Sequence, residues 1–176
     1  MAGAALLALP TEARAGEIQI ATGPGVYGSS WRGDGSAGQA LKLGYRFADL
    51  VAVDYVGRIG YGTVDDRVLT YLSLGATLYG RVWKTRPYVR LAFVHQHEES
   101  TPSVKNDPWG AMFGVGDGIR HRGGGGASLG VELPLFKVKP MEMLLGLDTS
   151  AAYFPDPRGP KLYAGGSFWF GVNFGI

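Results

Sequence analysis

Hydrophobic and polar residues alternate along most of the chain, in segments of about ten residues separated by turn residues. A period of two is typical of antiparallel strands with two different faces. In the clearest segment, 161–176, Phe168 and Phe170 lie on the apolar face and Ser167 and Gly171 on the other. The pattern predicts eight strands, at 17–28, 38–48, 50–61, 68–82, 88–97, 120–133, 142–153 and 161–176.

The connections between these segments alternate in length. Tight turns are expected at 48–49, 83–87 and 136–140, and longer polar loops at 29–37, 62–67, 98–119 and 154–160. Short periplasmic turns and long extracellular loops characterise transmembrane β-barrels, and an even strand number returns both ends of the barrel to one side. The stretch 101–118 is apolar enough to form a short helix or to fold over the barrel mouth.

The charged residues inside the segments all fall on one face, which is otherwise rich in glycine, alanine and serine. A soluble sandwich would expose that face to water, whereas a narrow eight-stranded barrel needs small residues in its lumen. We therefore expect the apolar face to contact lipid. Because unpaired charges in a confined interior cost several kcal/mol, we predict a salt-bridge network that fills the lumen. Its members are Lys42, Arg46, Asp54, Arg58, Arg81, Arg90, Glu132 and Asp148, with Glu142 near a rim.

These patterns predict an all-β protein, an eight-stranded antiparallel up-and-down transmembrane β-barrel over residues 16–176. Residues 1–15 are typical of the remnant of a signal peptide, since an apolar run precedes Ala13-Arg14-Ala15 and cleavage would leave Gly16 first. Aromatic residues near the segment ends are expected to form girdles at the lipid headgroups. They are Tyr45, Phe47, Tyr61, Trp83 and Tyr153.

Composition narrows the function further. The 176 residues suit one domain, and a net charge of +2 with 18% charged residues argues against a nucleic-acid partner. The chain has no cysteine, which excludes disulfides, thiolate metal sites and cysteine nucleophiles.

In these features residues 17–176 resemble the OmpA/OmpX-type small outer-membrane proteins, a likeness of architecture rather than of a catalytic motif. The resemblance implies a bacterial outer membrane, contact with its lipid and lipopolysaccharide, and no cofactor. It also implies that the last strand is an insertion signal for the outer-membrane assembly machinery, carried by Gly171, Phe174 and Ile176. The family usually ends on an aromatic residue, and Ile176 departs from that pattern.

The chain has three histidines, of which His95 and His97 share one face where a strand leaves the membrane. Two such rings with Glu98 or Glu99 suit zinc or copper. A polar rim at the interface is the simpler interpretation, and no metal site is predicted.

Catalysis by His95 or His97 with Glu98 and Ser100 would imitate a lipid A acyl hydrolase. The spacing differs from the His-x-Ser pattern of deacylases, so no catalytic residue is predicted. The tripeptide Arg32-Gly33-Asp34 matches an integrin-recognition sequence that glycine- and serine-rich loops produce readily. Guanidinium and ammonium groups suit lipopolysaccharide phosphates. The residues expected to meet them are Arg67, Lys105, Arg120, Arg122 and Lys161.

The leading hypothesis is therefore a non-enzymatic outer-membrane barrel that acts in membrane integrity, surface interaction or limited passage of small solutes. A lipid A-modifying acyl hydrolase is the first alternative. A soluble calyx, whose apolar faces would line a lipid-binding cavity, is the second.

Overall fold

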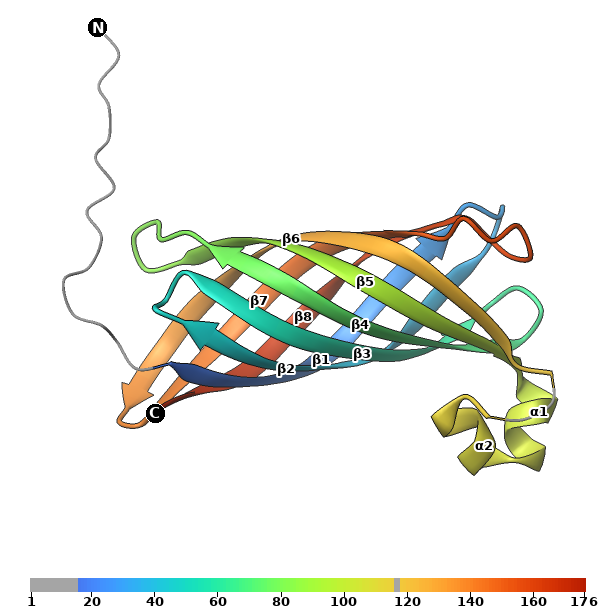
Figure 1. Cartoon of the computed structure of the whole chain (residues 1–176), viewed down its shortest axis with the longest axis horizontal. Coiled ribbons are helices and arrows are strands. Elements are labelled where there is room, and N and C mark those ends of the chain that lie inside the picture. Colours follow the sequence, from blue (N-terminus) through green and yellow to red (C-terminus); the bar gives the residue numbers. More distant parts are fainter. Residues whose placement is uncertain (1–15, 116–117) are drawn as a thin grey trace, which may run out of the picture.

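The computed structural model describes residues 16–115 and 118–176, so the predicted signal remnant at 1–15 lies outside the described residues. Eight antiparallel strands follow one another around a closed barrel, and the last strand pairs with the first (Figure 1). The predicted fold class is confirmed. The strands are β1 (Glu17–Ser29), β2 (Gly35–Phe47), β3 (Val51–Gly62), β4 (Arg67–Tyr79), β5 (Arg86–Ser100), β6 (Arg120–Val138), β7 (Met141–Tyr153) and β8 (Leu162–Gly175).

Alternate residues of each strand point outward and into the lumen. In β5, Leu91 and Phe93 point outward and are each 66% exposed, whereas Tyr88 and Arg90 point inward and are buried. The period-two pattern of the sequence thus becomes an apolar exterior and a polar interior.

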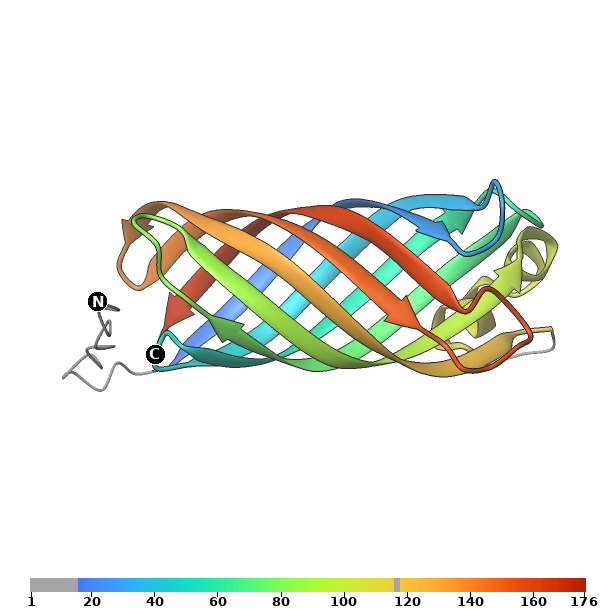
Figure 2. The same ribbon diagram turned by 90° about the horizontal axis from the view of Figure 1, so that it is seen from above.

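Gly16 and Ile176 lie together at one end of the barrel, here called the terminus end, where the Ile176 N–H donates to the Gly16 carbonyl at 3.1 Å. The turns at 48–50, 80–85 and 139–140 share this end. Ala48 and Asp49 both have positive φ, 47° and 60°, as a two-residue type I′ hairpin turn requires. The loops at 30–34, 63–66 and 154–161 and the β5–β6 connection lie at the opposite end (Figure 2).

Two connections, β5–β6 and β7–β8, show the expected longer loops. The contrast does not hold for every connection, since the 63–66 loop is shorter than the 80–85 turn. Several strand boundaries also differ from the prediction, among them the start of β2 at Gly35 and the end of β5 at Ser100. β6 runs on to Val138, so its turn is confined to 139–140, and β4 ends at Tyr79. The alternation past Tyr79 therefore belongs to a turn, and Arg81 lies there, exposed, rather than in the lumen.

Two short helices, α1 (Thr101–Asn106) and α2 (Pro108–Phe113), occupy the β5–β6 connection and mark what we call the helix end. Ser100 caps α1, since its Oγ accepts the Ser103 N–H at 3.3 Å. Gly114, at φ 66°, ends α2 in the left-handed region. Figure 1 shows the helices beside the barrel wall rather than across its mouth.

No helix among the described residues is both long and apolar enough to cross a membrane.

Candidate functional site: the lumen and its helix end

Glu132 of β6 gathers partners from three other strands near the terminus end of the lumen. Gln19 Nε2 donates to its Oε1 at 2.7 Å, and the Tyr79 hydroxyl donates to the same oxygen at 3.1 Å. Arg46 Nη2 lies 3.3 Å from Oε2, and Lys42 Nζ lies 3.7 Å from Oε1. All five side chains are buried, so this carboxylate ties together β1, β2, β4 and β6 in a solvent-poor layer.

A second carboxylate closes the same end. Glu142 Oε2 accepts from Arg86 Nη1 at 2.5 Å and from Asn173 Nδ2 at 3.4 Å. Glu17 Oε2 lies 3.7 Å from Arg46 Nε. The terminus end of the lumen is therefore filled by paired charges.

Asp54 holds the middle of the lumen. Its Oδ1 accepts from Arg90 Nε at 2.5 Å, and its Oδ2 accepts from the Thr77 hydroxyl at 2.5 Å. Arg90 Nη2 also donates to Ser73 Oγ at 3.2 Å. The Arg90–Asp54 ion pair therefore joins β5 to β3 across the inner side of β4. Thr77 and Ser73 of β4 bond to its two members.

Asp148 of β7 is the other mid-lumen carboxylate. Its Oδ2 accepts from Trp169 Nε1 at 2.9 Å and from the Tyr88 hydroxyl at 3.2 Å. The Arg58 guanidinium lies 3.8 Å from the same oxygen. Bulky aromatic donors thus occupy the space around the carboxylate that an open channel would need.

A cavity of about 20 Å³ remains beside Arg58, lined also by Tyr27, Tyr71, Val94 and Tyr163. That volume holds about one water molecule. It is far too small for a solute and lies between the mid-lumen charges and the next buried layer.

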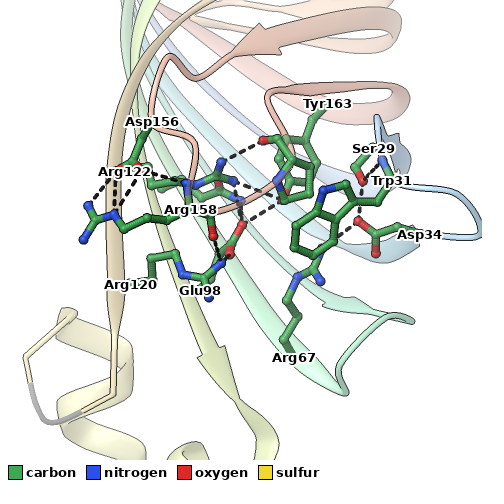
Figure 3. Close-up of polar contacts among 12 residues, drawn as sticks. Ser29, Trp31, Asp34, Arg67, Glu98, Arg120, Arg122, Asp156, Arg158 and Tyr163 are labelled. Carbon is green, nitrogen blue, oxygen red and sulfur yellow. Dashed lines mark hydrogen bonds and ion pairs between the residues drawn. The ribbon is translucent and has the colours of Figure 1, made fainter.

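Arg122 organises the lumen at the helix end, where the residue is only 2% exposed (Figure 3). Its Nη2 donates to Gln96 Oε1 and to Glu98 Oε1, each at 2.6 Å. The Tyr163 hydroxyl donates to the same Glu98 oxygen at 2.7 Å. Arg122 Nη1 donates to the Pro160 carbonyl at 2.7 Å, which ties the 154–161 loop to the barrel interior.

The first loop is tied in the same way. Arg67 Nη2 donates to Asp34 Oδ2 at 2.6 Å, and the Arg67 guanidinium lies 5.2 Å from the centre of the Trp31 ring (Figure 3). The Ser29 hydroxyl donates to the same carboxylate. Because Asp34 is buried in this contact, the Arg32-Gly33-Asp34 tripeptide does not offer its carboxylate to a partner.

The 154–161 loop also carries an exposed ion pair. Arg158 donates to both carboxylate oxygens of Asp156, with Nη2 to Oδ2 at 2.5 Å and Nε to Oδ1 at 3.0 Å. These hydrogen bonds, first of all those from the Arg158 side chain, lower the pKa of Asp156 to about 2. Arg158 is thereby engaged within its own loop.

The outside of the barrel is an apolar belt. Leu74 is 61% exposed and Leu129 62%, and the belt continues through Leu147 and Phe168. Exposed apolar patches on soluble monomers rarely exceed a few hundred Å². A band that encircles the barrel requires lipid around it, and a closed barrel leaves no unpaired sheet edge in that lipid. The soluble calyx, which needs its apolar faces inside, is wrong.

No family model matches the sequence, and no curated protein matches it. Solved structures do match its fold. Neisserial surface protein A aligns with a TM-score of 0.58 at 19% identity, over 92% of this chain and 97% of that one. The outer membrane protein OprG from Pseudomonas aeruginosa gives 0.53 at 13% identity, over 93% and 97%. Ail of Yersinia pestis gives 0.52 at 15% identity, over 92% and 99%.

The chain is an eight-stranded outer-membrane β-barrel. Its apolar exterior and its fold together place it in a bacterial outer membrane. In such barrels the short turns face the periplasm and the longer loops face outward, so the helix end is the extracellular end.

The barrel interior holds every residue predicted for the lumen network except Arg81. Two of the predicted surface cations are placed differently, since Arg67 and Arg122 are buried and ion-paired. The expectation that they contact lipopolysaccharide is wrong for both. Lys105 and Lys161 are exposed, and Arg120 is partly exposed with Nη1 3.1 Å from Glu98 Oε2.

The sequence did not identify the acceptors of this outer layer, Glu98 and Asp34. Glu98 lies near the end of β5, and Asp34 lies in a loop. A signal existed for Arg122, which shares strand parity with the lumen residues Ser128 and Glu132. The residues of the predicted insertion signal lie in or just after β8. Gly171 faces the lumen, Phe174 pairs with Ile18, and Ile176 follows the strand.

Proposed function

We propose that this chain is a non-enzymatic, non-conducting outer-membrane barrel whose extracellular rim binds saccharides that carry phosphate or sulfate groups. The observation that carries the proposal is a set of unpaired cations at the helix end of a barrel whose lumen is closed. Arg32, Lys105 and Lys161 are exposed at the helix end, and none of them forms an ion pair with another described residue. They come from three different connections, so a large polyanion is the ligand that engages them together.

The closed lumen argues against passage as the function. Successive layers centred on Glu132, Asp54, Asp148 and Glu98 cross the interior, and the space between two of them holds about one water molecule. These charges are engaged with one another, which leaves the loops as the part of the barrel available to a ligand.

The role of Ser100 argues against the hydrolase alternative. Its Oγ accepts the Ser103 N–H and so caps α1, and among the described residues it forms no hydrogen bond with His97. Nucleophilic catalysis requires a hydroxyl that donates its proton to a neighbouring base.

One structural neighbour supports the choice of ligand chemistry. Ail of Yersinia pestis is described in complex with the heparin analogue sucrose octasulfate, a highly sulfated sugar. Phosphate and sulfate both accept hydrogen bonds from guanidinium and ammonium groups. Lipid A phosphates and sulfated polysaccharides are therefore two sources of one ligand chemistry.

The test compares a rim variant with a matched variant at the opposite end. Arg32→Gln, Lys105→Gln and Lys161→Gln are combined in one chain, and Lys137→Gln with Lys139→Gln in the control, both exposed near the terminus end. Retention on heparin and binding to liposomes containing lipid A with or without its phosphates are measured in detergent-folded or liposome-inserted barrel. The rim variant should elute at lower salt or bind phosphorylated lipid A more weakly, and the affected arm identifies the source. Equal behaviour of rim and control variants in both assays would refute the proposal.

A further inference from the structure

The three histidines of the chain meet at the helix end, although one is far from the other two in sequence. His97 of β5 pairs directly with His121 of β6, and His95 lies two residues before His97 on the same face of β5. This face is the outside of the barrel, just beyond the outward-pointing Phe93 at the edge of the apolar belt.

The ring nitrogens lie at distances suited to one shared ion. His121 Nδ1 is 3.3 Å from His95 Nε2, and one nitrogen from each ring lies within 4.8 Å of the others. Zinc–nitrogen bonds of 2.0–2.1 Å in a tetrahedral site put neighbouring ligand atoms about 3.3 Å apart. One edge of the site already has that length, and rotation of the His97 ring brings its nitrogen toward the other two.

His97 lacks a partner that its burial demands. The residue is 4% exposed, and its Nδ1 has no hydrogen-bond partner among the described residues. Glu99, the next outward-facing residue of β5, is equally buried, and its Oε2 also lacks a partner in the described part of the chain. Buried polar atoms are nearly always paired, and a cation satisfies both an imidazole nitrogen and a carboxylate oxygen.

The chain encloses this group from outside as well. A Cβ atom on Gly114 would lie 2.1 Å from Cε1 of His97, so only glycine at the end of α2 lets the helices approach the ring. Its φ of 66° favours glycine at the same position. The barrel wall forms one side of the pocket and the end of α2 forms the other.

We propose that His95, His97 and His121 bind one divalent transition-metal ion of the zinc class, with a fourth position left to water or to Glu99. Three neutral imidazoles favour Zn²⁺, Ni²⁺ or Cu²⁺ over Mg²⁺ or Ca²⁺, which prefer oxygen ligands. The ion would cross-link β5 and β6 beneath the α1–α2 segment. The site lies outside the lumen and does not depend on the polyanion-binding rim.

The test uses the detergent-folded barrel without a polyhistidine tag, since its only imidazoles are then those of the site. Zn²⁺ affinity is measured by competition with a chromophoric chelator, and Co²⁺ is titrated to record its visible absorption. One ion per chain and the intense bands of tetrahedral Co²⁺ are expected. His95→Asn, His97→Asn and His121→Asn should each weaken Zn²⁺ binding about tenfold or more, while Gln39→Ala, an exposed polar change on the outside of β2, should not.

Folding of each variant is checked by heat-modifiable gel migration. His97 packs under Gly114, so if His97→Asn fails to fold, the more exposed His95 and His121 carry the test. Absence of stoichiometric Zn²⁺ binding by the unaltered barrel would overturn the proposal, and so would binding that survives both His95→Asn and His121→Asn.

Discussion

Arg90 Nε donates to Asp54 Oδ1 at 2.5 Å from β5 to β3, with β4 between the two strands. Both residues are buried, and Thr77 of the intervening strand donates to the other carboxylate oxygen. Removal of one partner leaves the other charge buried without compensation. We predict that Asp54→Ala lowers the free energy of unfolding by about 3–5 kcal/mol. Urea unfolding of the barrel in lipid vesicles measures it.

Two further variants make this measurement specific. The double variant Asp54→Ala with Arg90→Ala should cost less than the sum of the single changes, because it leaves no unpaired charge. Asp65→Asn removes the charge of a side chain that is 74% exposed, suits the positive φ of 60° at this position, and should cost less than about 1 kcal/mol. An Asp54→Ala cost no larger than that of Asp65→Asn would contradict the buried network.

The same network predicts that the barrel does not conduct ions. Planar bilayers that contain the purified barrel should show no sustained ionic current, because the lumen is crossed by side chains bonded to Glu132, Asp54 and Asp148. Arg90→Ser combined with Asp54→Ser, which removes both charges and much of their volume, should give brief, small openings at most. Stable large conductance steps from the unaltered barrel would show that the plug is absent.

The sequence predicts the fold more fully than it predicts the candidate site. Eight strands and their faces were predictable because alternation of Leu91 and Phe93 with Arg90 depends only on the pleat of each strand. Strand ends depend on turn geometry, which alternation does not record. Arg81 and Val82 continue the alternation of β4 by chance, so Arg81 was wrongly placed in the lumen.

The helix end was harder to predict, because contacts between loops depend on register and chain path. His121 lies beside His97 because of the β5–β6 register. The length of the connection between these strands does not reveal which residues pair. Arg67 and Arg122 looked like surface cations because they stand at strand starts. Their positions in the alternation of each strand place both side chains inside the barrel. There they form ion pairs with the buried carboxylates of Asp34 and Glu98.

Arg122 should control the order of the 154–161 loop rather than the barrel as a whole. Arg122→Met removes the donor to the Pro160 carbonyl and one ion pair of Glu98. Charged hydrogen bonds of this kind contribute about 1.5–3 kcal/mol, so amide exchange at Phe154, whose N–H donates to the Lys161 carbonyl at 2.8 Å, should accelerate about tenfold or more. Hydrogen exchange measured by NMR tests it. Lys161→Met, at an exposed side chain, should leave that amide unchanged, and equal rates in both variants would exclude a special role for Arg122.

The Asp156–Arg158 pair predicts how the same loop responds to acid. Arg158 lowers the pKa of Asp156 from its ordinary 3.8 to about 2, so the contact stabilises the loop fully above the ordinary value and is lost as pH falls toward 2. The carboxyl ¹³C signal of Asp156 should therefore titrate near pH 2. Arg158→Gln should return the midpoint toward 3.8, whereas Lys161→Gln should not move it. A midpoint near the ordinary value in the unaltered chain would mean that the pair does not form in solution.

The placement of the apolar exterior in lipid can be tested with a single outward charge. Leu91 points outward near the middle of β5, between the outward-pointing Val89 and Phe93. An arginine at the bilayer midplane of a β-barrel costs about 2–4 kcal/mol, so Leu91→Arg should lower the free energy of unfolding of the barrel in lipid vesicles by that amount. Trp83→Arg introduces the same charge at the 80–85 turn, where Trp83 is 94% exposed, and should cost close to nothing because the turn lies outside the hydrocarbon layer. Equally small costs for the two substitutions would mean that the outer surface of β5 faces water. The barrel would then not be embedded in lipid with its charges inside.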